Sequence, residues 1–557
     1  MCVMIRALPI GVQDFKEVRD SDYLYVDKSD MISQILSEGA KVYLYTRPRR
    51  FGKSLNLSML DAFFNIKYPK DNRWFDGLKV SECNECREHK NAYPVIYFDF
   101  KELGVANIDT FNSDLVDGMS DLYRTHKYLL DSDSIDEVDR SYFMDVISRR
   151  MNPIKLRKSI STLSRMLYEH HGKKVIVLFD EYDNPLLNAY SKEFHKDIIQ
   201  FMRDIMTSVF KGNESLMFGI ITGVTQIAKE SIFSGINNLK VNNIFSSKFD
   251  EMFGFTNDEV KSICEEYGRP DKYEEAKEWY DGYRFGDTEV YNPWSVLNYV
   301  DEGFRPQAYW AGTSGNSIID TLLDYSDEKV FEELLKLSQG ETIEKTVDPT
   351  ITFEDINGNP NNVYSIMVMS GYLNAVPIGR RHHISLPNGE MYQVFGDLLA
   401  KYVSRRYGDN DTISKVRRFS DAIVDNDPEE LEKALYDLFA STLSTKILDH
   451  EHAYQSAMAM LLMNLHGKYR VRLEFENGKG FMDIIMEPKV PLLPNIVIEL
   501  KRLKSEESVD RLIPEAKIAL EQIHDRDYIF GMKGRIFLYG IAFKGMEAKV
   551  LSETLSR

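Results

Sequence analysis

The apolar positions in the first half of the chain form short continuous runs separated by longer segments with spaced apolar positions. Residues 42–45 (VYLY), 93–100, 175–179 (VIVLF) and 216–221 are runs of the kind found in buried strands. Most of residues 105–170 has a helical pattern, with Asp- and Ser-rich breaks near 131–138. Alternation of strands and helices predicts an α/β fold with a central, mostly parallel sheet.

The second half shows a different pattern. Thr256, followed by two acidic residues, is a plausible helix N-cap, and residues 279–297 are rich in aromatic side chains. Such an aromatic stretch can stack on bases, but it is more often the core of a small domain. Residues 363–373 predict a helix that ends at Gly371. Three short strands, 469–475, 481–485 and 496–501, follow near the C-terminus as a meander.

A phosphate-binding loop is the first candidate site. Gly52, Lys53 and Ser54 follow the strand at 42–45 and open a helix that extends to about Asn65. Backbone N–H groups and the helix dipole attract phosphate at such a turn. Lys53 would reach the β- and γ-phosphates, and the Ser54 hydroxyl would bind Mg²⁺. The alternative is an ordinary strand–helix turn with a chance Gly-Lys-Ser.

An acidic pair ends the apolar run at 175–179. Asp180 would hold Mg²⁺ and Glu181 would polarise the attacking water as general base, with Asp183 as the next candidate base. The alternative is an acidic turn after a buried strand. At the end of the next strand, Thr222 or Thr225 would sense the γ-phosphate, unless these hydroxyls only satisfy local backbone groups.

Several strings together resemble the AAA-ATPase-like proteins that carry a C-terminal nuclease-like domain. They are RPRRFGKS at 47–54, VIVLFDEYDNP at 175–185, LPIGVQDF at 8–15 and YVDKS at 25–29. The resemblance covers nearly the whole chain and implies a P-loop fold of the AAA-like or STAND-like kind. It also implies that Arg47 in place of the first glycine of the usual G-x-x-x-x-G-K-[ST] pattern is normal. The resemblance suggests that residues 23–28 form a short strand near the nucleotide base, and an edge segment of the sheet is the equal alternative.

The predicted nucleotide-binding residues are Arg47, Arg49, Arg50, Phe51, Gly52, Lys53, Ser54, Leu55, Asp180 and Thr222. The three arginines would add positive charge around a triphosphate.

The C-terminal meander holds a second candidate site. Glu499 and Lys501 are two residues apart on one strand and so share a face, and Asp483 can join them from the neighbouring strand. Two carboxylates with a lysine suit Mg²⁺-assisted phosphodiester hydrolysis, because the carboxylates hold the ion and the lysine positions water and offsets negative charge. The alternative is a chance combination in a β-rich domain.

This arrangement resembles the PD-(D/E)xK nuclease superfamily. The resemblance implies a leading metal-binding glutamate at Glu451 and a helical glutamine at Gln522. Glu474 is a further acidic neighbour of the site. The family often has an arginine just before the motif aspartate, and this chain has Phe481 and Met482 there, a departure that concerns substrate contact rather than metal binding.

The net charge of the chain limits which parts of it can bind nucleic acid. The chain has 557 residues and a net charge of −18, which opposes a broad electrostatic grip on nucleic acid. Residues 441–557 hold 17 Lys+Arg and 16 Asp+Glu, so only this segment is near neutral. No apolar run approaches a membrane span and no leader is evident, so we expect a cytoplasmic protein.

Four cysteines are too few for a disulfide framework. Cys83 and Cys86, with His89 nearby, could form half a zinc site, but a solvated turn is the better interpretation.

We therefore predict a P-loop AAA-like ATPase domain (1–256), a helical, winged-helix-like region (257–345), a mixed connector (346–440) and a PD-(D/E)xK nuclease-like domain (441–557). The chain would bind and hydrolyse ATP with Mg²⁺, and its last domain would cut nucleic acid. The alternatives are an ATP-switched nucleic-acid or protein interaction module that does not cut, and a plain NTPase with structural C-terminal carboxylates. The sequence leaves open DNA versus RNA and a homo-oligomer with a site completed between subunits.

Overall fold

The structure is a computed structural model. It describes residues 6–190, 192–226, 232–233, 235–236, 238–310, 328–338, 340–351, 360–396, 398, 412–442, 458, 461–462, 465, 468–477, 480–489, 493–504, 506–526, 528–529 and 531–557. The chain forms two compact units. Unit 1 comprises residues 1–305 and 346–376, and unit 2 comprises residues 306–345 and 377–557. The chain therefore passes from one unit to the other three times.

The core of unit 1 is a parallel sheet of five strands in the order β2-β3-β4-β1-β5. The strands are β1 (Val42–Thr46), β2 (Val95–Asp99), β3 (Val175–Asp180), β4 (Leu216–Gly223) and β5 (Leu239–Asn242). Every residue of β1 and β3 is buried, as their continuous apolar runs predict. The central, mostly parallel sheet is confirmed. One strand, β4, separates β1 from β3, so the loops after β1 and β3 are not immediate neighbours.

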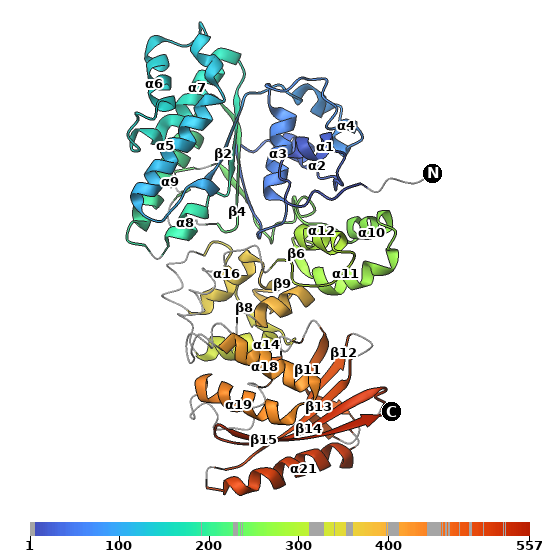
Figure 1. Cartoon of the computed structure of the whole chain (residues 1–557). Helices are drawn as coiled ribbons and strands as arrows, with labels where there is room; N and C mark the ends of the chain where they lie inside the picture. Colours follow the sequence, from blue (N-terminus) through green and yellow to red (C-terminus); the bar gives the residue numbers. More distant parts are fainter. Residues whose placement is uncertain are drawn as a thin grey trace. The chain divides into compact units, whose positions relative to one another are not determined.

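Helices cover both faces of this sheet (Figure 1), with α5, α6, α7 and α9 on one side and the group α1 to α4 on the other. The α5 helix shows why: its buried residues Phe111, Leu115, Met119 and Leu122 recur every three or four positions and so form one stripe. The helices are α1 (Phe15–Asp20), α2 (Asp30–Glu38), α3 (Lys53–Phe64), α4 (Lys79–Glu82), α5 (Ile108–Arg124), α6 (Glu137–Ile147), α7 (Ser159–His171), α8 (Asn184–Ala189) and α9 (His195–Phe210), with short 3-10 turns η1 (Glu85–His89), η2 (Phe100–Glu102), η3 (Lys127–Asp131) and η4 (Lys155–Lys158).

Unit 1 continues into a helical region with one hairpin, made of α10 (Asn257–Glu266), η5 (Pro270–Lys272), α11 (Tyr273–Tyr280), β6 (Tyr283–Phe285), β7 (Thr288–Val290) and α12 (Pro293–Asp301). The predicted cap is confirmed, because the Thr256 side chain accepts from Glu259 N–H while the Glu259 side chain accepts from Thr256 N–H. The helix α16 (Val363–Ser370), preceded by η6 (Pro360–Asn362), ends at Gly371 with φ 87°, also as predicted. Residues 23–28 form no strand and run as irregular chain.

Two features of unit 1 were not predicted. Cys83 and Cys86 form a disulfide with a Cα–Cα distance of 5.3 Å, where the sequence favoured a solvated turn over half a zinc site and predicted no disulfide framework. The helical region 257–305, predicted as part of a separate region 257–345, belongs to the same compact unit as the five-stranded sheet.

Unit 2 contains α14 (Glu328–Ser338), a small sheet in the order β8-β10-β9 (Ile343–Lys345, Arg381–Ser385 and Asn374–Ile378, the last beginning in unit 1), α18 (Thr412–Asp425) and α19 (Pro428–Thr442). It ends in a mixed sheet, β11 (Tyr469–Asn477), β12 (Gly480–Pro488), β13 (Asn495–Arg502), β14 (Arg535–Lys544) and β15 (Glu547–Ser556), with η9 (Val509–Arg511) and α21 (Leu512–Asp525) before β14. The predicted meander is confirmed, since β11-β12 and β12-β13 are antiparallel, while β13-β14 is parallel.

The two faces of this last sheet are covered by different helices (Figure 1). Ile484 and Ile498 belong to a core shared with residues of α18 and α19, whereas Ile485 and Val497 belong to a core shared with α21. Because side chains alternate along a strand, Glu499 and Lys501 share the face of Val497. The candidate metal site therefore lies on the face that α21 covers.

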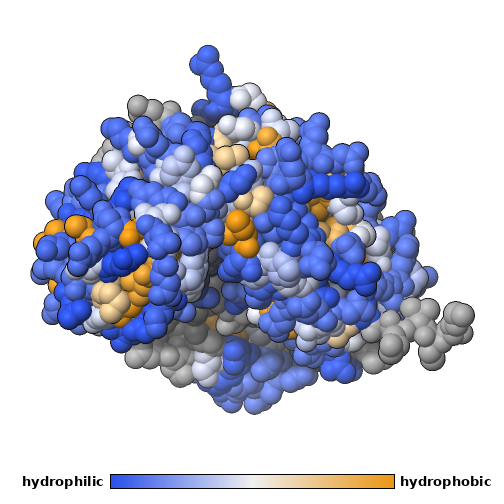
Figure 2. Space-filling view, turned by 90° about the horizontal axis from the view of Figure 1, so that it is seen from above, coloured by the Kyte–Doolittle hydropathy of each residue, from blue (hydrophilic) through white to orange (hydrophobic). Residues whose placement is uncertain are grey.

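The face of the molecule seen in Figure 2 is mostly hydrophilic, with scattered apolar patches. Within the described ranges, no helix combines the length and the apolar character that a membrane crossing requires.

Candidate functional site

The phosphate loop begins where β1 ends and closes at the first residue of α3. Gly52 has φ 84°, a left-handed conformation that glycine adopts without strain, and it caps α3. Lys53 is 5% exposed, and its Nζ donates to the carbonyl oxygens of Arg47 and Pro48, each at 3.0 Å. Burial lowers the pKa of Lys53, and the nearby carboxylates oppose this shift. The ammonium group thus faces the inside of its own loop, where phosphate oxygens could replace the carbonyls.

The three loop arginines lie in different environments. Arg47 is fully buried, donates to the carbonyls of Thr46 and Asn242 at 2.9 Å, and packs 5.0 Å from the ring centres of Phe253 and Phe285. Burial lowers its pKa to about 10, so it stays charged at neutral pH. This placement gives Arg47 a packing role, with no open side toward solvent.

Arg50 is half-buried and lies 4.3 Å above the ring of Trp294, next to the first residue of α12. Its φ is 70°, which is unusual for a residue other than glycine. Arg49 is also partly buried. Arg50 thus connects the phosphate loop with α12 of the helical region, and Arg47 connects it with β6 through Phe285.

The acidic side of the site lies at the ends of β3 and β4. Asp180 is 1% exposed, and its Oδ1 accepts from the Thr222 hydroxyl on β4 and from Glu181 N–H at 3.0 Å. Its Oδ2 accepts from the Tyr97 hydroxyl of β2 at 3.3 Å. The structure therefore brings Asp180 and Thr222 together, as expected for residues at one edge of a parallel sheet.

Glu181 and Asp183 differ in how their carboxylates are used. Asp183 is 1% exposed, and its Oδ2 accepts from the N–H groups of Val224 and Thr225, both at 2.8 Å. Glu181 is partly exposed, has φ 46°, and its carboxylate has no hydrogen bond or ion pair with any described residue. Asp183 thus anchors the end of β4, and Glu181 is the carboxylate left available to orient a water.

A fourth carboxylate, Asp99, was missed in the sequence. It ends β2 in register with Asp180. Burial, together with the charges of Asp180 and Glu181, raises the pKa of Asp99 to about 6, although its bond from Lys101 N–H opposes the shift. Asp99 lies within the run predicted at 93–100 and is the last residue of β2, so a search for acidic residues at strand ends, which selected Asp180, could have found it.

An apolar cavity opens beside the phosphate loop. Its walls include Leu24, Tyr25 and Val26, then Phe51, Gly52 and Leu55, and the residues Pro293 and Leu297 of α12. The segment 23–28 thus lies beside the phosphate loop, as irregular chain instead of the predicted strand, and its place near a base stays a prediction. An apolar cavity next to a phosphate loop suits a nucleobase.

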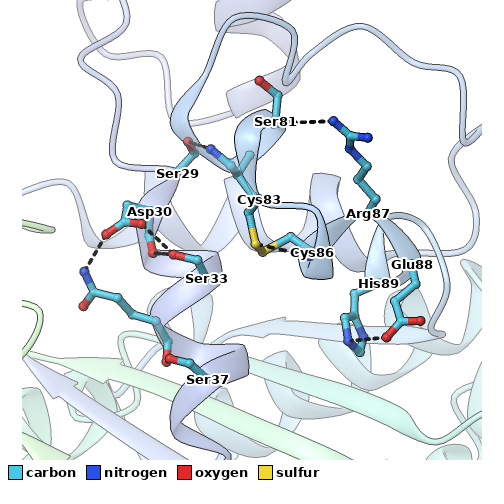
Figure 3. The surroundings of a disulfide bond; sticks show 12 residues. Ser29, Asp30, Ser33, Ser37, Ser81, Cys83, Cys86, Arg87, Glu88 and His89 are labelled. Carbon is cyan, nitrogen blue, oxygen red and sulfur yellow. Dashed lines mark hydrogen bonds and ion pairs between the residues drawn. A yellow bond between two sulfur atoms is a disulfide. The ribbon is translucent and has the colours of Figure 1, made fainter.

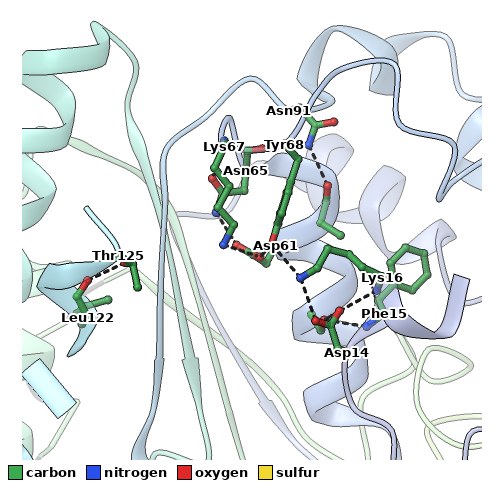
Figure 4. Close-up of polar contacts among 12 residues, drawn as sticks. Asp14, Phe15, Lys16, Asp61, Asn65, Lys67, Tyr68, Asn91, Leu122 and Thr125 are labelled. Atoms are coloured by element: carbon green, nitrogen blue, oxygen red, sulfur yellow. Dashed lines mark hydrogen bonds and ion pairs between the residues drawn. The ribbon is translucent and has the colours of Figure 1, made fainter. Parts of the chain in front are cut away.

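The wall of this cavity is anchored through Lys28. Lys28 donates from Nζ to both carboxylate oxygens of Glu259 and to the Glu251 carbonyl, all at 2.7 Å, and so ties the wall to α10. Figure 4 shows a separate set of contacts outside the cavity wall, where Lys16 of α1 contacts Asp14 and the Tyr68 hydroxyl at 3.0 and 2.9 Å. The same hydroxyl donates to Asp61 of α3 at 2.9 Å, so α1 is held on α3.

The second candidate site lies on β12 and β13. Asp483 Oδ2 accepts from Leu500 N–H at 2.7 Å, and Lys501 Nζ lies 3.4 Å from Glu499 Oε1. Gln522 of α21 also donates to Glu499 Oε1. The structure thus brings Asp483, Glu499, Lys501 and Gln522 together.

Glu499 is the most constrained group of this cluster. It is 3% exposed, and burial and the charge of Asp483 raise its pKa to about 7, with Lys501 opposing the shift. Its Oε2 is buried without a hydrogen-bond partner. A buried carboxylate oxygen of this kind, beside a second carboxylate, fits a divalent cation. Among the described residues no three His, Cys, Asp or Glu gather, so a cation at either site would rest on two carboxylates together with phosphate and water oxygens.

The remaining predicted residues have simpler outcomes. Ser54 and Leu55 lie partly buried in the first turn of α3. Glu451 lies outside the residues that the structure describes, and the side chain of Glu474 does too. The metal roles proposed for Ser54, Asp180 and Glu451 stay predictions.

Comparisons with known proteins agree with this division of the chain. Residues 9–233 match the family model described as predicted AAA-ATPase, and residues 449–553 match the PD-(D/E)XK nuclease superfamily. Both resemblances seen in the sequence are confirmed: the chain carries an AAA-ATPase-like domain followed by a C-terminal PD-(D/E)XK nuclease superfamily domain.

The whole chain also has a relative. An uncharacterized protein in the vnfD 5' region of Azotobacter chroococcum mcd 1 is 26% identical over 558 residues, which cover 97% of this chain and 96% of that protein. Among solved structures, the Aeropyrum pernix ORC2 protein (ADPNP-ADP complexes) is similar over 70% of this chain and 99% of that chain, with 12% identity and a TM-score of 0.25. A TM-score this low supports no conclusion about fold or function.

Proposed function

We propose that this protein binds and hydrolyses ATP in unit 1 and that its C-terminal domain cleaves nucleic acid with the help of Mg²⁺. The observation that carries the ATPase half is the meeting of three groups at one sheet edge: the buried Lys53 of the phosphate loop, the Asp180–Thr222 pair, and the available carboxylate of Glu181. These are the groups that position a triphosphate and its attacking water.

Each group has a stated part in the reaction. The N–H groups of the loop and Lys53 hold the β- and γ-phosphates, and the apolar cavity beside Phe51 holds the base. Glu181 accepts the proton of the water that attacks the γ-phosphate. Thr222 keeps Asp180 in place by its hydrogen bond. When bound, Mg²⁺ neutralises phosphate charge.

The nuclease half rests on the orphaned Oε2 of Glu499. Glu499 and Asp483 supply the oxygens that a cation requires, and Gln522 fixes the Glu499 carboxylate from α21. Lys501 is close enough to orient a water and to offset the charge that develops on the phosphate. Residues 441–557 are near neutral, whereas the rest of the chain is acidic, so the C-terminal domain is the part best suited to approach a nucleic acid.

Two assays test the proposal separately. Phosphate release from ATP with Mg²⁺ tests unit 1. Cleavage of single- and double-stranded DNA and RNA with Mg²⁺ or Mn²⁺, with and without ATP, tests the C-terminal domain. We expect ATP hydrolysis and cleavage of at least one nucleic acid. Binding without cleavage at any metal concentration would support instead an ATP-switched interaction module.

A further inference from the structure

The disulfide between Cys83 and Cys86 has one exposed side and one buried side. Cys86 is 1% exposed, whereas Cys83 is partly exposed. Cys86 N–H donates to the Cys83 sulfur at 3.2 Å, because Cys86 lies in the 3-10 turn η1 that begins two residues after Cys83. This donor would stabilise negative charge on Cys83 after reduction. One sulfur can therefore exchange with thiols in solution while its partner is protected.

A zinc site does not explain this pair. The sulfurs are bonded to each other, and His89, the nearby histidine in the sequence, is hydrogen-bonded through Nδ1 to the Tyr93 hydroxyl at 2.6 Å. Figure 3 shows the pair beside α2, where the Ser33 hydroxyl donates to Asp30 and the Ser29 hydroxyl accepts from Val80 N–H, so none of these groups bonds to the sulfurs. The surroundings favour thiol chemistry over metal binding.

The segment just before Cys83 is bonded to the wall of the apolar cavity. In α4, Lys79 N–H donates to Asp27 Oδ2 at 2.7 Å and Val80 N–H donates to Ser29 Oγ at 3.1 Å. Asp27 and Ser29 flank Lys28, which lines the cavity and holds Glu259. The disulfide fixes the chain at the C-terminal end of α4, and these two bonds pass that constraint to the cavity wall.

We propose that Cys83 and Cys86 form a reversible exchange site for small-molecule thiols and disulfides of the glutathione class, and that its oxidation state sets the affinity of the neighbouring cavity for adenine nucleotides. The second part rests on the proposed function. In oxidation, the Cys83 thiolate attacks a small-molecule disulfide and displaces one thiol. The Cys86 thiolate then attacks the Cys83 sulfur of the mixed disulfide and releases the second thiol. Two protein thiols and one small disulfide thus become one protein disulfide and two small thiols.

The direction of the effect follows from the contacts. With the disulfide closed, α4 and η1 are held together and the donors at Lys79 and Val80 stay aligned with Asp27 and Ser29. Reduction removes that constraint, so the wall residues Tyr25 and Val26 become less ordered in the free protein. Part of the nucleotide-binding free energy is then used to order them, and the affinity falls. We expect the reduced protein to bind ADP roughly fivefold more weakly than the oxidised protein.

The experiment uses the full chain equilibrated in mixtures of reduced and oxidised glutathione. Alkylation followed by peptide mass spectrometry measures the oxidised fraction of Cys83 and Cys86, and calorimetry with ADP measures affinity in each state. Hydrogen exchange of the amides at 25–29 gives a readout that needs no nucleotide. With Cys83→Ser or Cys86→Ser, neither ADP affinity nor amide exchange at 25–29 should depend on the ratio of reduced to oxidised glutathione. Cys264→Ser, which changes a buried free thiol in α10, is the matched control and should keep both dependences.

Each outcome decides the proposal. Reversible exchange at both cysteines, with faster amide exchange at 25–29 and weaker ADP binding after reduction, supports it. A pair that does not respond to glutathione mixtures overturns the exchange site. Equal amide exchange and equal ADP affinity in both states overturn the coupling. If neither state binds ADP, the proposed ATPase function fails, and the amide exchange alone decides whether the disulfide controls the cavity wall.

Discussion

Gly371, which ends α16, lies so close to Pro48 of the phosphate loop that a β-carbon on Gly371 would come within 2.8 Å of Pro48 Cβ. The two residues are more than 300 positions apart in the sequence, and both belong to unit 1. Gly371 also needs its φ of 87°, which other residues rarely adopt. The phosphate loop therefore packs, through Pro48, against the C-terminal end of α16, a segment more than 300 residues later in the chain.

Gly371→Ala should disturb this packing. We expect a loss of about 2–3 kcal/mol in the free energy of unfolding, from the left-handed φ and from the clash with Pro48. ADP affinity should fall as well, because Pro48 supplies a carbonyl to Lys53. Gly379→Ala is the matched control, since Gly379 has φ 60° and no atom within 4 Å of its added β-carbon. It should cost about 1 kcal/mol and leave ADP affinity unchanged. Equal ADP affinity in the Gly371 variant would show that the contact is irrelevant to the loop.

Lys53→Ala should weaken ATP binding by roughly tenfold or more, because hydrogen bonds to charged groups contribute about 1.5–3 kcal/mol. Calorimetry with ATP measures the change. Lys67→Ala, which removes a lysine just after α3 and its contact with Asp61, is the control for loss of one positive charge on this side of the fold. The same ATP affinity in the Lys53 variant and the wild type would refute the phosphate-loop assignment.

Glu181→Gln should keep ATP binding and lower the hydrolysis rate by roughly 10²- to 10⁴-fold, because an amide cannot take a proton from water. Asp183→Asn is an informative comparison. Asp183 accepts bonds from Val224 and Thr225, so its change should lower the unfolding temperature, and Glu181→Gln should not. If the Glu181 variant hydrolyses ATP at the wild-type rate, Glu181 is not the general base and another group takes the proton.

Asp483→Ala and Lys501→Ala should separate metal binding from the later chemistry. Asp483→Ala removes a carboxylate, so both Mn²⁺ binding and nucleic-acid cleavage should be lost, while ATP hydrolysis persists. Lys501→Ala should retain Mn²⁺ binding and lose cleavage, because its role is on the water and the developing charge. Lys504→Ala, an exposed lysine beyond β13, is the control and should cut normally. Cleavage that survives Asp483→Ala would remove the nuclease site from this meander.

His126 should make stability depend on pH. Burial, followed by the charges of Lys67 and His171, lowers the pKa of His126 from 6.5 to about 4. The folded protein thus binds this proton more weakly than the unfolded chain does. Above pH 6.5 His126 is neutral in both states and costs no stability. As the pH falls toward 4 the unfolded chain gains this proton first, and the free energy of unfolding falls by about 3 kcal/mol. In urea titrations His126→Leu should show a smaller loss of stability between pH 6.5 and 5 than the wild type. An unchanged pH slope would contradict this assignment.

The sequence was most informative where one local rule determines the outcome. The continuous apolar runs located β1, β3 and β4, the cap at Thr256 and the end of a helix at Gly371 needed only neighbouring residues, and the two-residue period placed Glu499 and Lys501 on one face. Each of these depends on backbone geometry within a few residues.

What the sequence could not provide depends on distant parts of the chain. Arg47 lies within a loop motif, yet its side chain is fixed by Asn242, Phe253 and Phe285, none of which the motif reveals. The strand order was also out of reach, because nothing local states that β4 is inserted between β1 and β3. The disulfide was missed because the prediction relied on the total number of cysteines. The short separation of Cys83 and Cys86, with two residues between them, indicated better that these two could pair.

The triple passage of the chain between its units has a practical consequence for cutting it. A protease nick in any one connection, near 305, 345 or 376, would leave the two units joined by intact peptide chain through the other two. For the same reason, a gene fragment that stops at residue 305 would lack the segment 346–376, and with it the glycine that lies behind Pro48. An intact unit 1 thus requires residues 346–376 to be supplied together with residues 1–305, either fused to them through a linker or as a second polypeptide.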